Sequence, residues 1–366
     1  MTSPFTKLRS QFDWPLAGIM LIIIAIGLVN LYSATRVAPK GLYQNQIMWL
    51  CVGSVLFVVV AAIDYRIYER IAPIVYVLCL GLLVAVLVAG KGVKGSRRWF
   101  GFGSFGIQPS EVMKIGLILM LAKLLSADAQ ELRASGLRMV AWTLGIILVP
   151  AFLIYRQPDL GTAGLLYIIG MSMVLFSQMG GAAKAVELGL APVLVLVRLA
   201  FGLKDYQKKR LAVFLDPQTD PSGAGYHARQ SVYAIGSGRW SGKGYLHGTQ
   251  NRLKFLPEHW TDFPFAVWAE EWGLAGSLVL LGCYLFLILW ALGVSATARD
   301  RFGQVLALGV AALLFWHVVV NIGMVTGVLP VVGVTLPLFS YGGSSLLTVM
   351  IALGLLMNVS IRRYSY

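Results

Sequence analysis

The sequence has 366 residues, of which 58% are hydrophobic and 13% charged, with 30 Lys and Arg against 16 Asp and Glu. Soluble domains carry about 25% charged residues, so this composition excludes an ordinary water-soluble protein. The strong excess of basic residues comes without any nucleic-acid fold signature, which excludes a nucleic-acid partner as its explanation.

Continuous apolar runs recur along the whole sequence, and about 20 helical residues suffice to cross a bilayer core of about 30 Å. Outer-membrane barrels show alternating rather than continuous apolar residues, so a barrel is excluded. We expect an all-α polytopic membrane protein, one integral membrane domain over residues 1–366. About ten transmembrane helices are predicted, near residues 15–33, 46–64, 71–90, 111–126, 137–155, 160–178, 185–203, 264–294, 302–326 and 341–361.

The charges of the short loops set the expected orientation. With a cytoplasmic N-terminus, the inner loops and tails hold eleven Lys and Arg and the short outer loops hold seven. The positive-inside rule favours this arrangement, which places both termini in the cytoplasm. Residues 204–262 then form a long extracytoplasmic loop between the seventh and eighth spans. Its turn dipeptides flank a predicted short amphipathic helix near residues 226–235.

Two outer segments carry more positive charge than this rule predicts. Residues 91–111 hold four cations among glycines and aromatics, and residues 204–262 hold nine. These cations could contact anionic lipid headgroups, or they could form a site for an anionic ligand, since Arg matches the geometry of a phosphate group. The three cysteines have no spacing that suits a metal ion.

Two further groups of charges lie at membrane depth or beside it. Glu111 and Lys114 are three residues apart, so they could pair on one helix face or line a polar cavity. The stretch "FLPEHWTDFPFAVWAEEWG" holds four carboxylates. Asp262 could cap the helix that Pro264 starts, or act as a general base, or both. Glu270 and Glu271 lie about 12 Å further along the helix axis, and we interpret them as members of supporting ion pairs.

Several motifs occur in order along the chain: "KGSRRW", "QPSE", "QPDLGT", "GKG...GTQ", "TDF.FAV.AEE.G" and "SYGGSS". Together they resemble the SEDS family (shape, elongation, division and sporulation), and its rod-shape branch more than its division branch. The sequence departs from the family pattern at Trp260, where a His usually precedes "TDF", and at Pro264. Neither departure affects Asp262.

The resemblance implies a peptidoglycan glycosyltransferase of the bacterial inner membrane that polymerises lipid II into glycan strands for cell elongation. The implied partners are a class B penicillin-binding protein, which is a transpeptidase, and other membrane proteins of the elongation complex. Asp262 matches the essential acid of the family. The implied candidates for substrate binding or support are Lys94, Arg98, Glu111, Lys114, Asp159, Arg210 and Lys243, and Ser340, Tyr341 and Ser344 could add hydrogen bonds.

The implied chemistry suits these residue types. An inverting transfer needs a base for the acceptor hydroxyl and positive charge for the departing polyprenyl diphosphate. No cofactor is certain, although a divalent cation, Mg²⁺ or Mn²⁺, could share the diphosphate charge. Two other functions would also use many spans and polar outer loops, namely a lipid flippase and a scaffold for wall-synthesis proteins that does no chemistry.

Overall fold

The structure, a computed structural model, describes residues 12–36, 41–93, 96–102, 105–127, 136–189, 212–214, 224–253, 255 and 259–363. Nine long helices in these residues match nine of the ten predicted spans. They are α2 (Trp14–Thr35), α3 (Leu42–Ala62), α4 (Tyr65–Ala89), α5 (Pro109–Leu125), α7 (Gly136–Arg156), α8 (Leu160–Leu175), α13 (Pro264–Ala296), α14 (Arg301–Val325) and α15 (Gly343–Arg362).

Seven of these helices are long and apolar enough to cross a membrane, and α5 and α8 are shorter, with 17 and 16 residues. The chain is therefore a polytopic helical membrane protein. The seventh predicted span, 185–203, falls mostly outside the described residues, although residues 181–189 are helical.

Aspartates determine where several of these helices begin. The carboxylates of four Asp residues accept hydrogen bonds from backbone N–H groups in the first turn of the helix that follows. Such capping satisfies donors that have no partner within the helix. These N-caps are Asp13 for α2, Asp64 for α4, Asp159 for α8 and Asp300 for α14.

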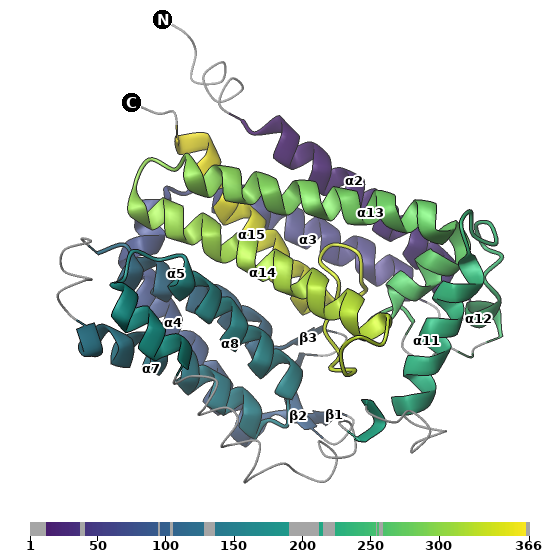
Figure 1. Ribbon diagram of the computed structural model, residues 1–366, viewed down its shortest axis with the longest axis horizontal. Coiled ribbons are helices and arrows are strands. Elements are labelled where there is room, and N and C mark those ends of the chain that lie inside the picture. The colour runs from purple at the N-terminus through teal and green to yellow at the C-terminus, as the bar shows by residue number, and fades with distance from the viewer. Residues whose placement is uncertain are drawn as a thin grey trace, which may run out of the picture.

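The helices form a bundle in which α5 lies near the centre, against α4, α7, α8, α14 and α15 (Figure 1). The guanidinium of Arg363 and the carboxylate of Asp13 form an ion pair of 3.7 Å, so the two ends of the described chain meet on one face. We call this face the terminal face. The strands and helices α11 and α12 lie toward the opposite end of the bundle (Figure 1).

The segment after α4 contains a small sheet that was not predicted from the sequence. Strands β1 (Lys91–Val93), β2 (Ser96–Phe102) and β3 (Phe105–Ile107) pair antiparallel in chain order. The pairing aligns Lys91 with Trp99 and Phe102 with Phe105. The fold is thus helical with one short three-stranded addition among the described residues.

The long loop before α13 contains the predicted short helix. Helix α11 (Ala224–Gly238) packs on α13, and its Ser231 hydroxyl donates to the carbonyl of Val325 at 2.7 Å. The much shorter α12 (Thr249–Arg252) follows. The loop is therefore attached to the bundle by ordered elements.

Helix α13 is interrupted at Gly273, whose φ of 66° and ψ of −162° are not helical. The backbone of residues 239–244 enters this break. The N–H groups of Lys243 and Gly244 donate to Glu270 and Glu271 carbonyls, each at 3.0 Å. The Arg239 and Trp240 carbonyls accept from Leu274 and Ala275. Backbone groups that the broken helix leaves unpaired at membrane depth are thus satisfied by the loop.

Residues 326–342, between α14 and α15, are not helical, as the repeated Gly and Pro of this stretch predict. Side chains from the surrounding helices satisfy its backbone. Asn321 donates to the carbonyl of Val334 at 2.6 Å, and Tyr284 donates to the carbonyl of Pro337 at 2.6 Å. This segment, which we call the re-entrant segment, forms one wall of the cavity described next.

Candidate active site

A cavity of about 550 Å³ opens at the end of the bundle opposite the terminal face. Several separate parts of the chain meet there: α3, strands β2 and β3, the starts of α5, α8 and α15, the turn before α13 and the re-entrant segment. Seven predicted site residues line it, namely Arg98, Glu111, Lys114, Asp159, Asp262, Tyr341 and Ser344.

Asp262 lies half-buried in the turn before α13. A Cβ atom at Gly333 would lie 3.4 Å from Oδ2 of Asp262, so the carboxylate faces the re-entrant segment. The Asn321 amide donates to the Asp262 carbonyl at 3.1 Å and fixes the backbone there. The N-cap of α13 is Phe263 and not Asp262, and Phe263 makes no side-chain capping hydrogen bond.

Glu111 and Lys114 pair as the spacing predicted, with 2.7 Å between Lys114 Nζ and Glu111 Oε1. Lys114 Nζ also lies 3.0 Å from Nε2 of His317, which comes from α14. Lys114 is 1% exposed and Glu111 8%. Both alternatives left open by the sequence therefore hold, because the two residues pair with each other and also line the cavity.

Arg98 and Asp159 form a second pair across the cavity. Their Nη1 and Oδ2 atoms lie 3.4 Å apart, and Gln108 donates to the same Oδ2 at 3.3 Å. Arg98 also donates to the carbonyls of Gln157 and Pro158. Asp159 Oδ1 accepts from the N–H of Thr162 at 3.2 Å, so one carboxylate caps α8 and orients an arginine.

Ser344 joins the three-stranded sheet to the start of α15. Its hydroxyl donates to the Gly106 carbonyl at 3.0 Å and accepts from the Gln108 N–H at 3.1 Å. Ser340, in contrast, is not one of the described residues that line the cavity. It is buried, and its hydroxyl accepts from the N–H of Leu336 at 2.8 Å, which holds the re-entrant segment in shape.

The charged groups that line the cavity are three carboxylates and two cations, counted over the described residues. The carboxylates of Glu111 and Asp159 are each held in an ion pair. Asp262 is the third of the lining carboxylates. Within the same residues, no group of three or more His, Cys, Asp or Glu side chains is placed to hold a metal ion.

The sequence matches the model of a known protein family over nearly its whole length. The family model described as "cell cycle protein", which covers FtsW, RodA and SpoVE, matches residues 14–365. The chain belongs to the FtsW/RodA/SpoVE family. The match extends over the whole helical bundle, and it confirms the resemblance that the ordered motifs carry.

Individual relatives of the FtsW/RodA/SpoVE family agree with this over nearly the full chain. Peptidoglycan glycosyltransferase MrdB of Escherichia coli K12 is 42% identical over 357 residues, 97% of this chain and 95% of that protein. Stage V sporulation protein E of Bacillus subtilis is 36% identical over 370 residues, 98% of this chain and 99% of that protein.

Solved structures show the same fold. A chain solved in work on the structural coordination of polymerization and crosslinking by a peptidoglycan synthase complex has a TM-score of 0.82 and 34% identity, covering 97% of this chain and 99% of its own length. The rod shape determining protein RodA of Thermus thermophilus has a TM-score of 0.73 and 30% identity, covering 97% of this chain and 98% of its own length.

Besides Ser340, three of the predicted FtsW/RodA/SpoVE site residues are not placed in the cavity. Lys94 and Arg210 lie outside the described residues. Lys243 lies elsewhere, with its Nζ 2.6 Å from Oε1 of the buried Glu270. The Thr249 N–H and hydroxyl also donate to that oxygen, at 2.8 and 2.9 Å. Glu270 is thus a member of an ion pair, as predicted, and its partner Lys243 holds the loop against α13.

Glu271 was also predicted to be a member of a supporting ion pair, and here the structure differs. Its Oε1 accepts from the hydroxyl of Ser33 at 2.5 Å, and none of the described ion pairs includes it. The residue is 1% exposed and lines a second hollow, beside Arg36 and Arg252. It therefore joins α13 to α2 through a neutral hydroxyl.

Some residues that line the cavity, or contact a residue that lines it, were not predicted from the sequence. His317 is the most important, since it contacts Lys114 from α14. Its only signal in the sequence is a His within the apolar stretch "LLFWHVVVN", one of four His in the chain. Gln108, Trp49 and Trp99 also line the cavity.

Proposed function

We propose that the chain is a peptidoglycan glycosyltransferase that polymerises lipid II into glycan strands for cell elongation. The observation that carries this proposal is the meeting of Asp262, Arg98 and Lys114 in one cavity at the end of the bundle away from the termini. Membership of a family whose relatives carry this activity in their names supports it.

The reaction assigned to the cavity is an inverting transfer. The Asp262 carboxylate takes the proton of the acceptor sugar hydroxyl while that oxygen bonds to the anomeric carbon of the donor. The bond from the anomeric carbon to the diphosphate oxygen breaks, and its electron pair leaves with the polyprenyl diphosphate. A positioned carboxylate base contributes about 10²–10⁴-fold to such a rate.

Two cations serve the leaving group in this proposal. Arg98 and Lys114 are each held by a carboxylate, Asp159 and Glu111, so their positions are fixed before substrate arrives. Fixed positive charge stabilises a developing diphosphate anion without reorganisation. Lys94 and Arg210 are proposed to add to this charge, and Tyr341 to add a hydrogen bond to the substrate. A bound Mg²⁺ or Mn²⁺ would also neutralise diphosphate charge.

The proposal includes a location and partners. The chain is one integral domain of the bacterial cytoplasmic membrane, with both termini in the cytoplasm and the cavity on the outer face. The excess of Lys and Arg in the inner loops supports this orientation. A class B penicillin-binding protein cross-links the product, and other elongation-complex membrane proteins join them. The likeness to a chain of a peptidoglycan synthase complex supports the first partner.

The test is polymerisation of lipid II by the purified chain, with and without its cognate penicillin-binding protein. Asp262→Asn removes the base and keeps the shape, so we expect folded protein with activity lower by about 100-fold or more. Arg70→Gln, at an exposed position of α4 near the terminal face, is the matched control and should polymerise normally.

Polymer at the normal rate from Asp262→Asn would refute the assigned base. Movement of lipid II across liposomes by the wild type, without any polymer, would instead indicate a flippase.

A further inference from the structure

A hollow of about 230 Å³ lies on the terminal face, at the end of the bundle opposite the cavity. It is lined by Asp64, Tyr65, Arg66, Arg299 and Arg362. Three of these five residues are arginines, and they come from three different parts of the chain: the first turn of α4, the connection before α14 and the last turn of α15. The fold therefore brings the three arginines together, which do not simply lie in a row along one helix.

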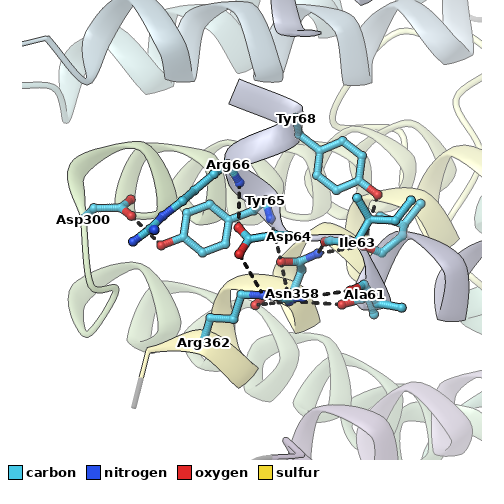
Figure 2. Close-up of polar contacts among 11 residues, drawn as sticks. Ala61, Ile63, Asp64, Tyr65, Arg66, Tyr68, Asp300, Asn358 and Arg362 are labelled. Atoms are coloured by element: carbon cyan, nitrogen blue, oxygen red, sulfur yellow. Dashed lines mark hydrogen bonds and ion pairs between the residues drawn. The ribbon is translucent and has the colours of Figure 1, made fainter. Parts of the chain in front are cut away.

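The walls of the hollow are held by a network centred on Asn358, which is fully buried (Figure 2). Asn358 Oδ1 accepts from the Tyr65 N–H at 3.1 Å and from Arg362 Nη1 at 2.7 Å. Arg362 Nη2 also donates to the Ala62 carbonyl at 2.8 Å. Arg362 is therefore fixed by the end of α3 and by its own helix, and the hollow has a defined shape.

The two carboxylates near the hollow are already engaged. Asp300 Oδ2 accepts from the Tyr65 hydroxyl (Figure 2), and its Oδ1 accepts from the Gly303 N–H at 2.8 Å. Asp64 Oδ1 accepts from the Arg66 N–H at 3.0 Å, and its Oδ2 lies 3.7 Å from Arg362 Nε. Both are also N-caps, so helices α4 and α14 begin here with the positive ends of their dipoles.

An apolar surface adjoins the hollow. Val59 and Ile63 at the end of α3, and Ile67 in the first turn of α4, are 47%, 38% and 48% exposed. In a membrane protein such side chains face acyl chains. Positive charge beside an apolar surface suits a phospholipid, which carries a phosphate next to its acyl chains.

We propose that this hollow binds the phosphodiester headgroup of an anionic phospholipid, with Arg66 and Arg299 contacting the phosphate and the acyl chains lying along Val59, Ile63 and Ile67. Arginine suits this role because its planar guanidinium binds phosphate oxygens in pairs. Arg362 shapes the site and adds charge. The site shares no lining residue with the cavity that holds Asp262, so the proposal does not rest on the proposed reaction.

The test is native mass spectrometry of the full chain in detergent, titrated with phosphatidylglycerol or with phosphatidylcholine. Each Lys or Arg near an anionic lipid contributes a factor of about five in affinity, so Arg66→Ala/Arg299→Ala should weaken phosphatidylglycerol binding by about 25-fold. Arg70→Ala/Arg138→Ala removes the same charge at two exposed positions of the same face and should change binding less than twofold. Gel filtration checks that both double variants are folded.

Three results would overturn the proposal. The first is equal weakening in both double variants, which indicates general attraction to headgroups. The second is equal binding of phosphatidylcholine. The third is displacement of phosphatidylglycerol by equimolar glycerol 1-phosphate, which assigns the site to a free phosphate ester instead of a lipid.

Discussion

Lys114 Nζ lies 3.0 Å from His317 Nε2, and each of the two side chains is 1% exposed. The other ring nitrogen of His317, Nδ1, lies 3.1 Å from the carbonyl oxygen of Thr335. A carbonyl only accepts, so Nδ1 carries the proton and Nε2 accepts from the ammonium group. Among the described residues, Glu111 and His317 thus accept two of the three N–H groups of Lys114, and we propose that the third donates to a ligand in the cavity.

We therefore expect His317→Leu to lower polymerisation of lipid II by about tenfold or more, because Lys114 loses an acceptor that orients it. If His317 acts through Lys114, Lys114→Ala/His317→Leu should be no less active than Lys114→Ala alone. Rates of polymer formation for the two single variants and the double variant check this. Fully additive losses would show that the two residues act separately.

The two roles of Asp159 can be separated by two substitutions. Asn caps helices about as well as Asp, so Asp159→Asn should keep the thermal midpoint of unfolding and lose activity with the Arg98 ion pair. Asp159→Ala should also lose about 1 kcal/mol of stability, because α8 loses its cap. Midpoints and polymerisation rates measured together test this. A normal rate in Asp159→Asn would limit the residue to capping.

Lys243 and Glu270 should behave as a structural pair. Lys243→Met leaves a buried carboxylate without its cation, at a cost of about 3–5 kcal/mol. Lys243→Met/Glu270→Gln removes both charges and should unfold at a higher temperature than Lys243→Met. Thermal unfolding of the purified variants measures this. A double variant that is less stable than Lys243→Met would contradict the pairing.

The close approach of the loop to α13 predicts a strong effect at one glycine. Gly242 has a φ of +78°, and a Cβ there would lie 2.1 Å from the Glu271 carbonyl oxygen. Gly242→Ala should lower the free energy of unfolding by about 2 kcal/mol or more. In Gly236→Ala, within α11, the added Cβ meets open space, so no loss is expected. Equal effects of the two substitutions on thermal unfolding would exclude the packing explanation.

Much of the fold is predictable because membrane spans follow from length and apolarity alone. The nine described long helices lie where continuous apolar runs occur, and α11 lies where the loop is amphipathic. The three strands were missed because Gly-rich segments such as 91–107 give no alternating pattern. The break at Gly273 was missed for another reason, since it depends on backbone from residues 239–244.

The candidate site was predictable where a motif brings its residues together locally, as with Glu111 and Lys114. It was not predictable where partners come from distant helices. Nothing in the sequence connects His317 with Lys114, 203 positions earlier. Lys243 is the opposite case, because this motif cation pairs with Glu270 outside the cavity. The N-cap of α13 lies one residue after Asp262, within the usual uncertainty of helix boundaries.

The interrupted α13 changes which parts of the chain would accept an epitope tag or a fluorescent protein. Long surface loops usually tolerate added residues. Here the backbone of residues 239–244 must reach both sides of Gly273, with Arg239 and Trp240 on one side and Lys243 and Gly244 on the other. One extra residue within 239–244 would put these hydrogen bonds out of register. Residues 239–244 belong to a long loop, but they are therefore a poor place for an insertion.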